Sequence, residues 1–486
     1  MFKKILCALL ASMMLVGTLV SCATSGDDPT VDGEGTQAST REEDTREKLE
    51  IPDTRYDGKE LCFLVREEGS WSTVEIFTES KNVNADNISY AVFERNDRIL
   101  QKYGVNITQS TTGSLTNEVA APTGDFLAVV TNVHSAASNA TSGFLWNLRS
   151  DSIQYIDTTK PWWDNKMAEG LSIDDRLYFA TGDIMTLDND ATFAVMFNKL
   201  LAKNCQLPNL YELVDNGQWT MDKLYEFSQT AVQDLDGTVG LSYDQDISGF
   251  AYTMDGPACM LIGGGVTLTK KDENDMPYYD LNLELAQNIS DKCKLLFSKD
   301  YTVNLSAASV GVEEAGKKCF GENHSLFFAE CLQCVTRVRG YDVDFGILPF
   351  PMYDVAQGKY YSMMHNTASM VSIPKSVGED DVVMVSSMIE AMAYHSADTL
   401  TEQYYEINLK TKGAKDEKSG PMIDKILENR ACDLAYYYKW GNGAFDQLAS
   451  TMLPSSSLSV SSVDSRVKSR IKREIQNLLD DMDDFK

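Results

Sequence analysis

The sequence predicts an α/β fold built from more than one domain. From about residue 56 onward, short apolar runs of strand length alternate with longer segments whose apolar residues recur at helical spacing. The chain has 486 residues, 43% of them hydrophobic, which is enough for roughly two to four domains, each with its own core. Such alternation is typical of sheets that are covered by helices on both faces.

The first strands and the first helix of this body have clear boundaries. Residues 61–65, Leu-Cys-Phe-Leu-Val, form a short apolar run and predict a buried strand. A helix is predicted over residues 86–103, because its apolar residues share one face and Gly104 is suited to end it. Residues 105–108 and 125–130 predict the next two strands.

The later part of the chain is richer in helices. Thr220 is suited to cap a helix that follows it. Residues 345–351 predict a strand that leaves its sheet, because the run ends in two prolines, which cannot donate to a strand ladder. The remaining predicted elements are strands over residues 325–329 and 370–374, and helices over 281–298, 380–394 and 465–482.

The charge balance excludes some classes of partner. The chain has 43 Lys and Arg against 72 Asp and Glu, a formal net charge of −29. Nucleic-acid binding depends on basic side chains that neutralise phosphates, and docking on anionic lipid needs a basic face. The composition therefore argues against both and suits a protein that meets neutral or cationic small ligands. Only four His are present, and none lies near another in the sequence, so common His-based zinc motifs are absent.

The amino terminus has the pattern of a secretory signal. Lys3 and Lys4 precede a largely apolar run over residues 5–20, which is short for a membrane span. The run ends Leu-Val-Ser-Cys and resembles a bacterial lipoprotein signal, which implies that residues 1–21 are removed and Cys22 carries lipid. An ordinary cleaved signal or an uncleaved anchor are the alternatives. Residues 22–50 are polar and acidic and predict a flexible tether.

The remaining cysteines do not form a recognisable framework. Eight Cys follow Cys22, too few in a chain this long for a disulfide scaffold. Cys331 and Cys334 have CxxC spacing, but no second pair supports a zinc site and no second motif supports redox chemistry. Buried thiols or one incidental disulfide are expected.

One loop has an acidic pattern that is reminiscent of a calcium site. The segment from Asp234 to Asp246 begins Asp-Leu-Asp-Gly, but it departs from the EF-hand pattern at positions 5, 6 and 12, which are Thr238, Val239 and Gln245. An Asp/Gly turn is the better interpretation, and no metal or cofactor is expected.

Several phrases, in this order, resemble the family 1 extracellular solute-binding proteins, the carbohydrate receptors of ABC importers. They are residues 90–96 (Tyr-Ala-Val-Phe-Glu-Arg-Asn), 161–164 (Pro-Trp-Trp-Asp), 177–183, 197–199, 217–220 and 344–351. The resemblance implies a two-lobed periplasmic-binding-protein-like fold of the class II type with a ligand cleft between the lobes. Lobe one would comprise residues 51–190 and 346–395, and lobe two residues 191–345 and 396–486.

The resemblance also implies a mechanism. Ligand binding would favour a closed arrangement of the lobes over an open one, and the closed form would dock on a membrane permease. The chain would act as a monomer, anchored to the outside of the cell membrane through lipid on Cys22, and would carry out no covalent chemistry.

Sugar sites need flat aromatic side chains and polar groups around them. Trp71 follows the first strand, where open α/β sheets bind ligands. Trp162 and Trp163 would point in opposite directions on a strand, so that one enters the core and the other reaches the cleft. Trp440 lies in an aromatic cluster, and Trp219 is expected in the core. The remaining candidates are Asp183, Asp188, Tyr252 and Glu330.

Three other functions remain open at this stage. A solute-binding protein for a peptide or another non-sugar ligand would keep the fold and suit the negative charge. A glycoside hydrolase needs two carboxylates, which an acid-rich chain always offers, although no GxSxG, HExxH or Walker motif is present. A surface adhesin would need neither hinge nor cleft.

Overall fold

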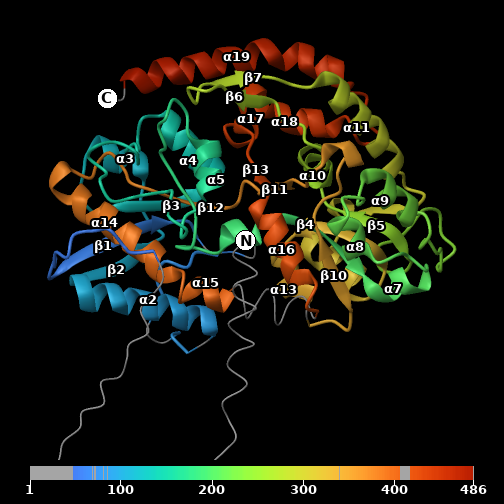
Figure 1. Cartoon of the computed structure of the whole chain (residues 1–486), viewed down its shortest axis with the longest axis horizontal. Coiled ribbons are helices and arrows are strands. Elements are labelled where there is room, and N and C mark those ends of the chain that lie inside the picture. The colour runs from blue at the N-terminus through green and yellow to red at the C-terminus, as the bar shows by residue number, and fades with distance from the viewer. Residues whose placement is uncertain are drawn as a thin grey trace, which may run out of the picture. The chain divides into compact units, whose positions relative to one another are not determined.

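The structure is a computed structural model that describes residues 47–67, 69, 73–79, 82–84, 86–338, 340–404 and 416–484 (Figure 1). The predicted signal peptide, Cys22, most of the tether and Trp71 lie outside the described residues. Residues 47–486 form one compact unit. Among the helices that the structure describes, none is both long and apolar enough to cross a membrane.

The first sheet has four strands in the order β12-β3-β1-β2 (Figure 1). Strands β1 (Lys59–Val65), β2 (Val105–Ser110) and β3 (Ala128–Asn132) are parallel, and β12 (Ser369–Ser372) pairs antiparallel with β3. Helix α2 (Asn87–Tyr103) begins after Asp86, which accepts from the Ser89 N–H, and ends at Gly104 with φ 73°. The predicted helix and the first two strands are confirmed, whereas the strand predicted over residues 125–130 begins only at Ala128.

The helices of the first lobe pack around this sheet. α14 (Glu379–Ser396) lies against α2, and α4 (Val133–Thr141) follows β3 directly and contacts β12. The predicted helix over residues 380–394 is thus confirmed. The shorter helices of this region are α3 (Leu115–Ala120), α5 (Asn165–Leu171) and α6 (Leu187–Asp190). α15 (Leu400–Glu402), in the segment that follows α14, also contacts α2.

The second sheet has five strands in the order β10-β4-β9-β5-β8. Strands β9 (Ser325–Cys331), β5 (Ser248–Tyr252) and β8 (Thr302–Asn304) are parallel, while β4 (Phe193–Asn198) is antiparallel to both β9 and β10 (Phe345–Leu348). Every residue of β9 is buried, as expected for a central strand covered on both faces. The helices of this region are α7 (Lys199–Asn204), α8 (Leu210–Asp215), α9 (Met221–Ser228), α12 (Val312–Gly316), α13 (Gln333–Val338) and α16 (Ser419–Glu428).

The chain passes between the two sheets three times. The passages lie between α6 and β4, between β10 and β12, and between α14 and α16, which packs on β10. The predicted lobe boundary at residue 346 falls inside β10, whose residues 346–348 pair with β4, so the chain leaves the second sheet only after Leu348. A short parallel pair joins β11 (Ser362–Met363), on the second passage, with β13 (Arg430–Ala431), which directly follows α16.

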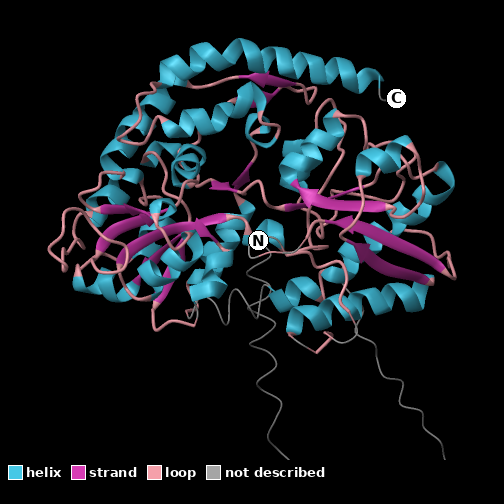
Figure 2. Cartoon of the chain, turned by 180° about the vertical axis from the view of Figure 1, so that it is seen from behind, coloured by secondary structure: helices cyan, strands magenta, loops and turns pink. Residues whose placement is uncertain are grey.

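A carboxy-terminal layer lies above both sheets in Figure 1 and is seen from behind in Figure 2. Its long helix α19 (Val460–Asp484) contacts α11 (Leu283–Leu296) and α18 (Trp440–Ser450) on one side and α4 on the other. The predicted apolar face of this helix is buried, from Val467 to Met482. The layer also contains α10 (Gly256–Gly263), α17 (Leu434–Tyr437) and the hairpin β6 (Thr269–Lys271) with β7 (Pro277–Tyr279).

Candidate functional site

Two cavities lie where the two lobes face each other, one on each side of α6. The first, called here the Glu330 cavity, has a volume of about 470 Å³ and is lined by Thr253, Asp255, Glu330, His365, Tyr436 and Asp446, among others. The second, called the Asp190 cavity, has a volume of about 860 Å³ and is lined by Glu75, Asp86, Thr186, Asp190, Thr336 and Tyr404, among others. Both volumes lie in the range of small-ligand sites.

The Glu330 cavity is built at the edge of the second sheet. Glu330 lies near the carboxyl end of β9, and Thr253 follows the carboxyl end of β5. These two strands are parallel neighbours, so their carboxyl ends meet at the same edge, where open α/β sheets bind ligands. His365, just before β12 of the first sheet, faces this edge, and Tyr436 and Asp446 arrive from the carboxy-terminal layer.

Glu330 is a buried carboxylate that accepts from the backbone N–H and the side chain of Cys331. Its Oε1 accepts from the Cys331 N–H at 2.8 Å. Burial raises the pKa of Glu330 to about 7, despite this hydrogen bond, and the nearby charge of Asp255 raises it further while His365 opposes it. Glu330 therefore lies in the cavity as a group that gains from any additional donor or cation.

The other polar groups of the cavity are close to one another. His365 Nε2 lies 3.5 Å from Asp255 Oδ1, and its Nδ1 lies 2.9 Å from Thr367 Oγ1. Burial, followed by the charge of Asp255, raises the pKa of Asp446. The Tyr436 hydroxyl accepts from the Asn366 side-chain amide at 3.3 Å. The cavity thus joins three carboxyl groups with aromatic rings.

Thr253 is the least satisfied polar group of this wall. Its side chain is only 3% exposed, and its Oγ1 has no hydrogen-bond partner among the residues that the structure describes. A buried hydroxyl without a partner is costly, and a ligand in the cavity can provide the missing partner.

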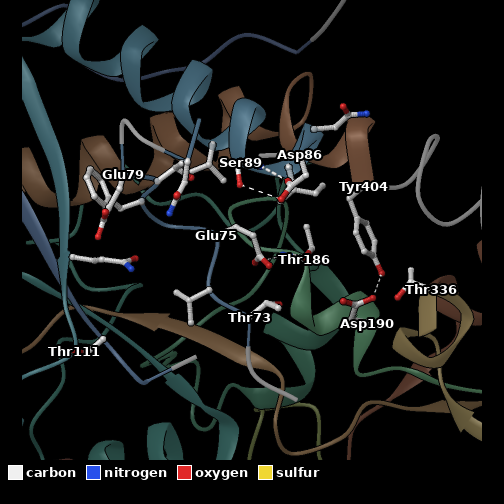
Figure 3. A pocket seen from close by; sticks show the side chains of 18 residues that line it. Thr73, Glu75, Glu79, Asp86, Ser89, Thr111, Thr186, Asp190, Thr336 and Tyr404 are labelled. Carbon is white, nitrogen blue, oxygen red and sulfur yellow. Dashed lines mark hydrogen bonds between the residues drawn. The ribbon is translucent and has the colours of Figure 1, made fainter. Parts of the chain in front are cut away.

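The carboxylates of the Asp190 cavity already have protein partners (Figure 3). The Tyr404 hydroxyl donates to Asp190 Oδ1 at 2.6 Å, and burial raises the pKa of Asp190 to about 7. Glu75 accepts from the Thr186 N–H at 3.1 Å, and Asp86 caps α2. On the same wall Thr73 Oγ1 and Gln109 Oε1 have no partner among the described residues. The Glu330 cavity is the better candidate site because Glu330 and Thr253 lie together at the carboxyl ends of two parallel strands.

The expectation that Trp162 and Trp163 point in opposite directions is wrong. Residues 160–163 form a turn rather than a strand, and both indoles reach the same carboxylate. Trp162 Nε1 donates to Glu390 Oε1 and Trp163 Nε1 to Glu390 Oε2, each at 2.8 Å. Both side chains are buried and line neither cavity, so we do not retain them as ligand contacts.

Asp183 and Asp188 also lie away from both cavity walls. Asp188 is buried and pairs with Arg430 at 3.1 Å, and Arg430 pairs in turn with Asp164 at 3.1 Å. Burial raises the pKa of Asp188 to about 6 and that of Asp183 to about 7. The paired Asp188 is a structural group at the passage from the first lobe.

The two remaining aromatic candidates are packing residues. Tyr252 is buried and lies against Phe250 and Phe297, with ring centroids 5.9 and 4.4 Å away. Trp440 is buried and stacks on Tyr438 at 5.2 Å. Of the predicted contacts that the structure describes, Glu330 alone lines one of the two cavities. Trp219 is buried, as predicted.

Sequence reasoning missed Thr253, Asp255, His365 and Asp446. The first two follow β5 directly, so the rule that ligands bind beyond the carboxyl ends of strands was the signal that could have found them. His365 and Asp446 come from a passage and from a helix of the carboxy-terminal layer, and no local pattern marks them.

The acidic loop and the CxxC pair have local roles. Asp246 accepts from the backbone N–H groups of Leu235 and Ser242, each at 2.7 Å, and thereby closes the turn that carries Asp234 and Asp236. This agrees with the Asp/Gly turn predicted there. Cys331 and Cys334 are buried free thiols.

No protein-family model matches the chain, and no curated protein matches it. Solved structures do. A family 1 extracellular solute-binding protein from Bifidobacterium longum subsp. infantis aligns over 85% of this chain and 99% of its own, with a TM-score of 0.54 and 10% identity. An ABC substrate-binding protein from Listeria monocytogenes in complex with cycloalternan covers 88% and 100%, with a TM-score of 0.51 and 11% identity.

A third similar structure is the maltose/maltodextrin-binding domain MalE from Bdellovibrio bacteriovorus bound to maltotriose. It covers 86% of this chain and 100% of its own, with a TM-score of 0.50 and 12% identity. At these identities the likeness concerns the fold. The chain therefore has the two-lobed α/β fold that these ABC solute-binding proteins share, as its sequence predicts.

Proposed function

We propose that this protein is an extracellular, lipid-anchored receptor that captures a carbohydrate in the Glu330 cavity and delivers it to an ABC importer. The observation that carries the proposal is the cavity itself, which combines carboxylates, an unpartnered hydroxyl and aromatic rings between two lobes. The similar structures described above, two of which hold oligosaccharides, support a sugar as the ligand. The receptor acts as a monomer and carries out no covalent chemistry.

The lobes move as two bodies in this proposal. The first comprises residues 51–190 and 349–395, and the second residues 191–348 and 396–486, with the boundary moved from 346 to keep β10 whole. Groups from both lobes line the Glu330 cavity, so a ligand that contacts both favours the closed arrangement by its difference in affinity for the two forms.

A thermal-shift screen of the purified protein tests the ligand class. Mono- and oligosaccharides, amino acids and peptides are compared, because a ligand at about a hundredfold excess over its Kd stabilises the folded state by about 2.7 kcal/mol. We expect a shift with a sugar, and mass spectrometry should recover that sugar unchanged. Shifts with peptides alone would keep the receptor and reject the sugar, while a cleaved product would indicate a hydrolase.

The anchor is tested separately. Incorporation of a radiolabelled fatty acid in a bacterial host is expected for the wild type and should be abolished in Cys22→Ala. Labelling that persists in the variant would contradict lipidation at Cys22.

A further inference from the structure

We propose that the ligand of the Glu330 cavity is an amino sugar, whose ammonium group lies among Asp255, Glu330 and Asp446. This rests on the proposed function and specifies its substrate class. Three carboxyl groups line this cavity, and none of the described residues that line it is Lys or Arg. The single basic side chain in the lining is His365, beside Asp255.

Basic groups beside the lining are engaged elsewhere. Arg66 donates to the Thr367 carbonyl at 2.7 Å and to Ser369 Oγ at 3.0 Å. Arg337 donates to Gln333 Oε1 at 2.7 Å and lies 3.5 Å from Glu313. Lys439 acts on Asp446 through its charge alone, since no ion pair joins the two among the described residues. Apart from His365 beside Asp255, no cationic side chain pairs with the carboxylates of the cavity among the described residues.

The same cavity shows why the cation should belong to a sugar. Thr253 Oγ1 is buried, lines the cavity and has no partner in the described part of the chain, so it can pair with a ligand hydroxyl. Phe193 and Tyr436 offer flat apolar surface for the C–H face of a pyranose ring, and Asn366 adds an amide. A simple polyamine would leave Thr253 and these surfaces unused.

The Arg430 centre gives an internal standard for this argument. There, two buried carboxylates, Asp164 and Asp188, share a guanidinium supplied by the chain. In the Glu330 cavity three carboxyl groups line the wall, and of the described residues that line it only His365 is basic. An ammonium group on the ligand completes the second centre as Arg430 completes the first.

Isothermal titration calorimetry of the full chain tests the inference. The probes are a glucosamine disaccharide, its neutral N-acetylated counterpart of the same linkage, and 1,4-diaminobutane. We expect the amine sugar to bind about tenfold or more tightly than the acetylated one, because the ammonium contributes a partly desolvated ion pair. This preference should shrink when salt rises from about 20 mM to about 500 mM.

Variants locate the effect. Glu330→Gln and Asp446→Asn should each reduce the preference for the amine at least about threefold. Asp86→Asn is the matched control, because it removes a carboxylate from the Asp190 cavity while asparagine still caps α2. The control should keep the full preference, and circular dichroism should show all three variants folded.

Each other outcome is decisive. Equal or tighter binding of the acetylated sugar, insensitive to salt, would overturn the amino-sugar inference and leave the carbohydrate receptor intact. Binding of the diamine alone would overturn the sugar itself. If neither disaccharide binds, the inference fails, and the broader sugar screen decides the proposed function.

Discussion

Burial raises the pKa of two carboxyl groups, Glu330 in the cavity and Glu390 beside Trp162 and Trp163, to about 7. The two differ in the hydrogen-bond donors that the protein supplies to them. Glu390 accepts from two indole N–H groups, one for each oxygen, and from the Asp157 N–H at 3.3 Å. Glu330 accepts from the backbone N–H and the side chain of Cys331 and faces open space beside Thr253, whose hydroxyl has no partner within the described ranges.

This difference in hydrogen-bond partners distinguishes polar groups that stabilise the fold from those that we propose contact a ligand. Where the chain supplies donors to both oxygens of a buried carboxylate, as at Glu390, or a countercharge, as Arg430 does for Asp164 and Asp188, the group stabilises the lobe or a passage. At the Glu330 cavity the fold leaves partners out, and we propose that a ligand supplies them. Three substitutions test this division, taken from the largest expected effect to the smallest.

Arg430→Met should be the most damaging. It leaves Asp164 and Asp188 buried without their cation, which costs about 3–5 kcal/mol of the free energy of unfolding. Because burial already raises the pKa of Asp188 to about 6, the loss should be larger at pH 8 than at pH 5, where the carboxyl can take up a proton. Urea unfolding at both pH values measures it.

Arg430→Met combined with Asp188→Asn is the control for the charge. The double variant should recover part of the lost stability, since one of the two unpaired charges is gone. A single variant that loses less than about 1 kcal/mol would mean that the ion pairs contribute little.

Glu390→Gln should cost less, about 1–3 kcal/mol at pH 5, because glutamine can accept from one indole only. Burial raises the pKa of Glu390 to about 7, so the folded protein binds a proton that the unfolded chain has released. The free energy of unfolding of the wild type therefore falls as pH rises from about 4.5 to about 7, and that of the variant does not.

The difference in the free energy of unfolding between wild type and Glu390→Gln should accordingly be smaller at pH 8 than at pH 5. Urea midpoints across this range give this difference directly. A difference that stays constant or widens would contradict the burial of a titrating carboxyl at this position.

Thr253→Val should have the smallest effect and the opposite sign. Replacing an unpartnered buried hydroxyl with a methyl group should stabilise the ligand-free protein by up to about 1 kcal/mol and weaken sugar binding. Thr192→Val is the matched comparison, because the buried Thr192 hydroxyl donates to the Asp188 carbonyl at 2.7 Å and its loss should destabilise. If both variants destabilise equally, Thr253 has a partner in solution.

Local sequence patterns predicted the elements that surround the site. α2 begins after Asp86 and ends at Gly104, as expected, and the apolar stripe from Val467 to Met482 lies on α19. The central strand that carries Glu330 was also predicted. These predictions succeed because capping and periodicity depend on residues a few positions apart, which the sequence displays directly.

The same reasoning misjudged most of the aromatic candidates. Trp162 and Trp163 were assigned to a strand, but a turn directs both indoles to Glu390 on α14, more than two hundred residues later. A tryptophan suits a core and a sugar equally well, so its residue type alone does not decide between them.

The sequence by itself determined the alternation of strands and helices and the acidic character of the chain, and its resemblance to solute-binding proteins implied the division into two lobes. Only the tertiary structure decided which carboxylates are paired. Asp188 meets Arg430 across 242 positions, and His365 meets Asp255 from the opposite lobe. Periodicity is a property of neighbours along the chain, whereas satisfying a buried charge is a property of neighbours in space.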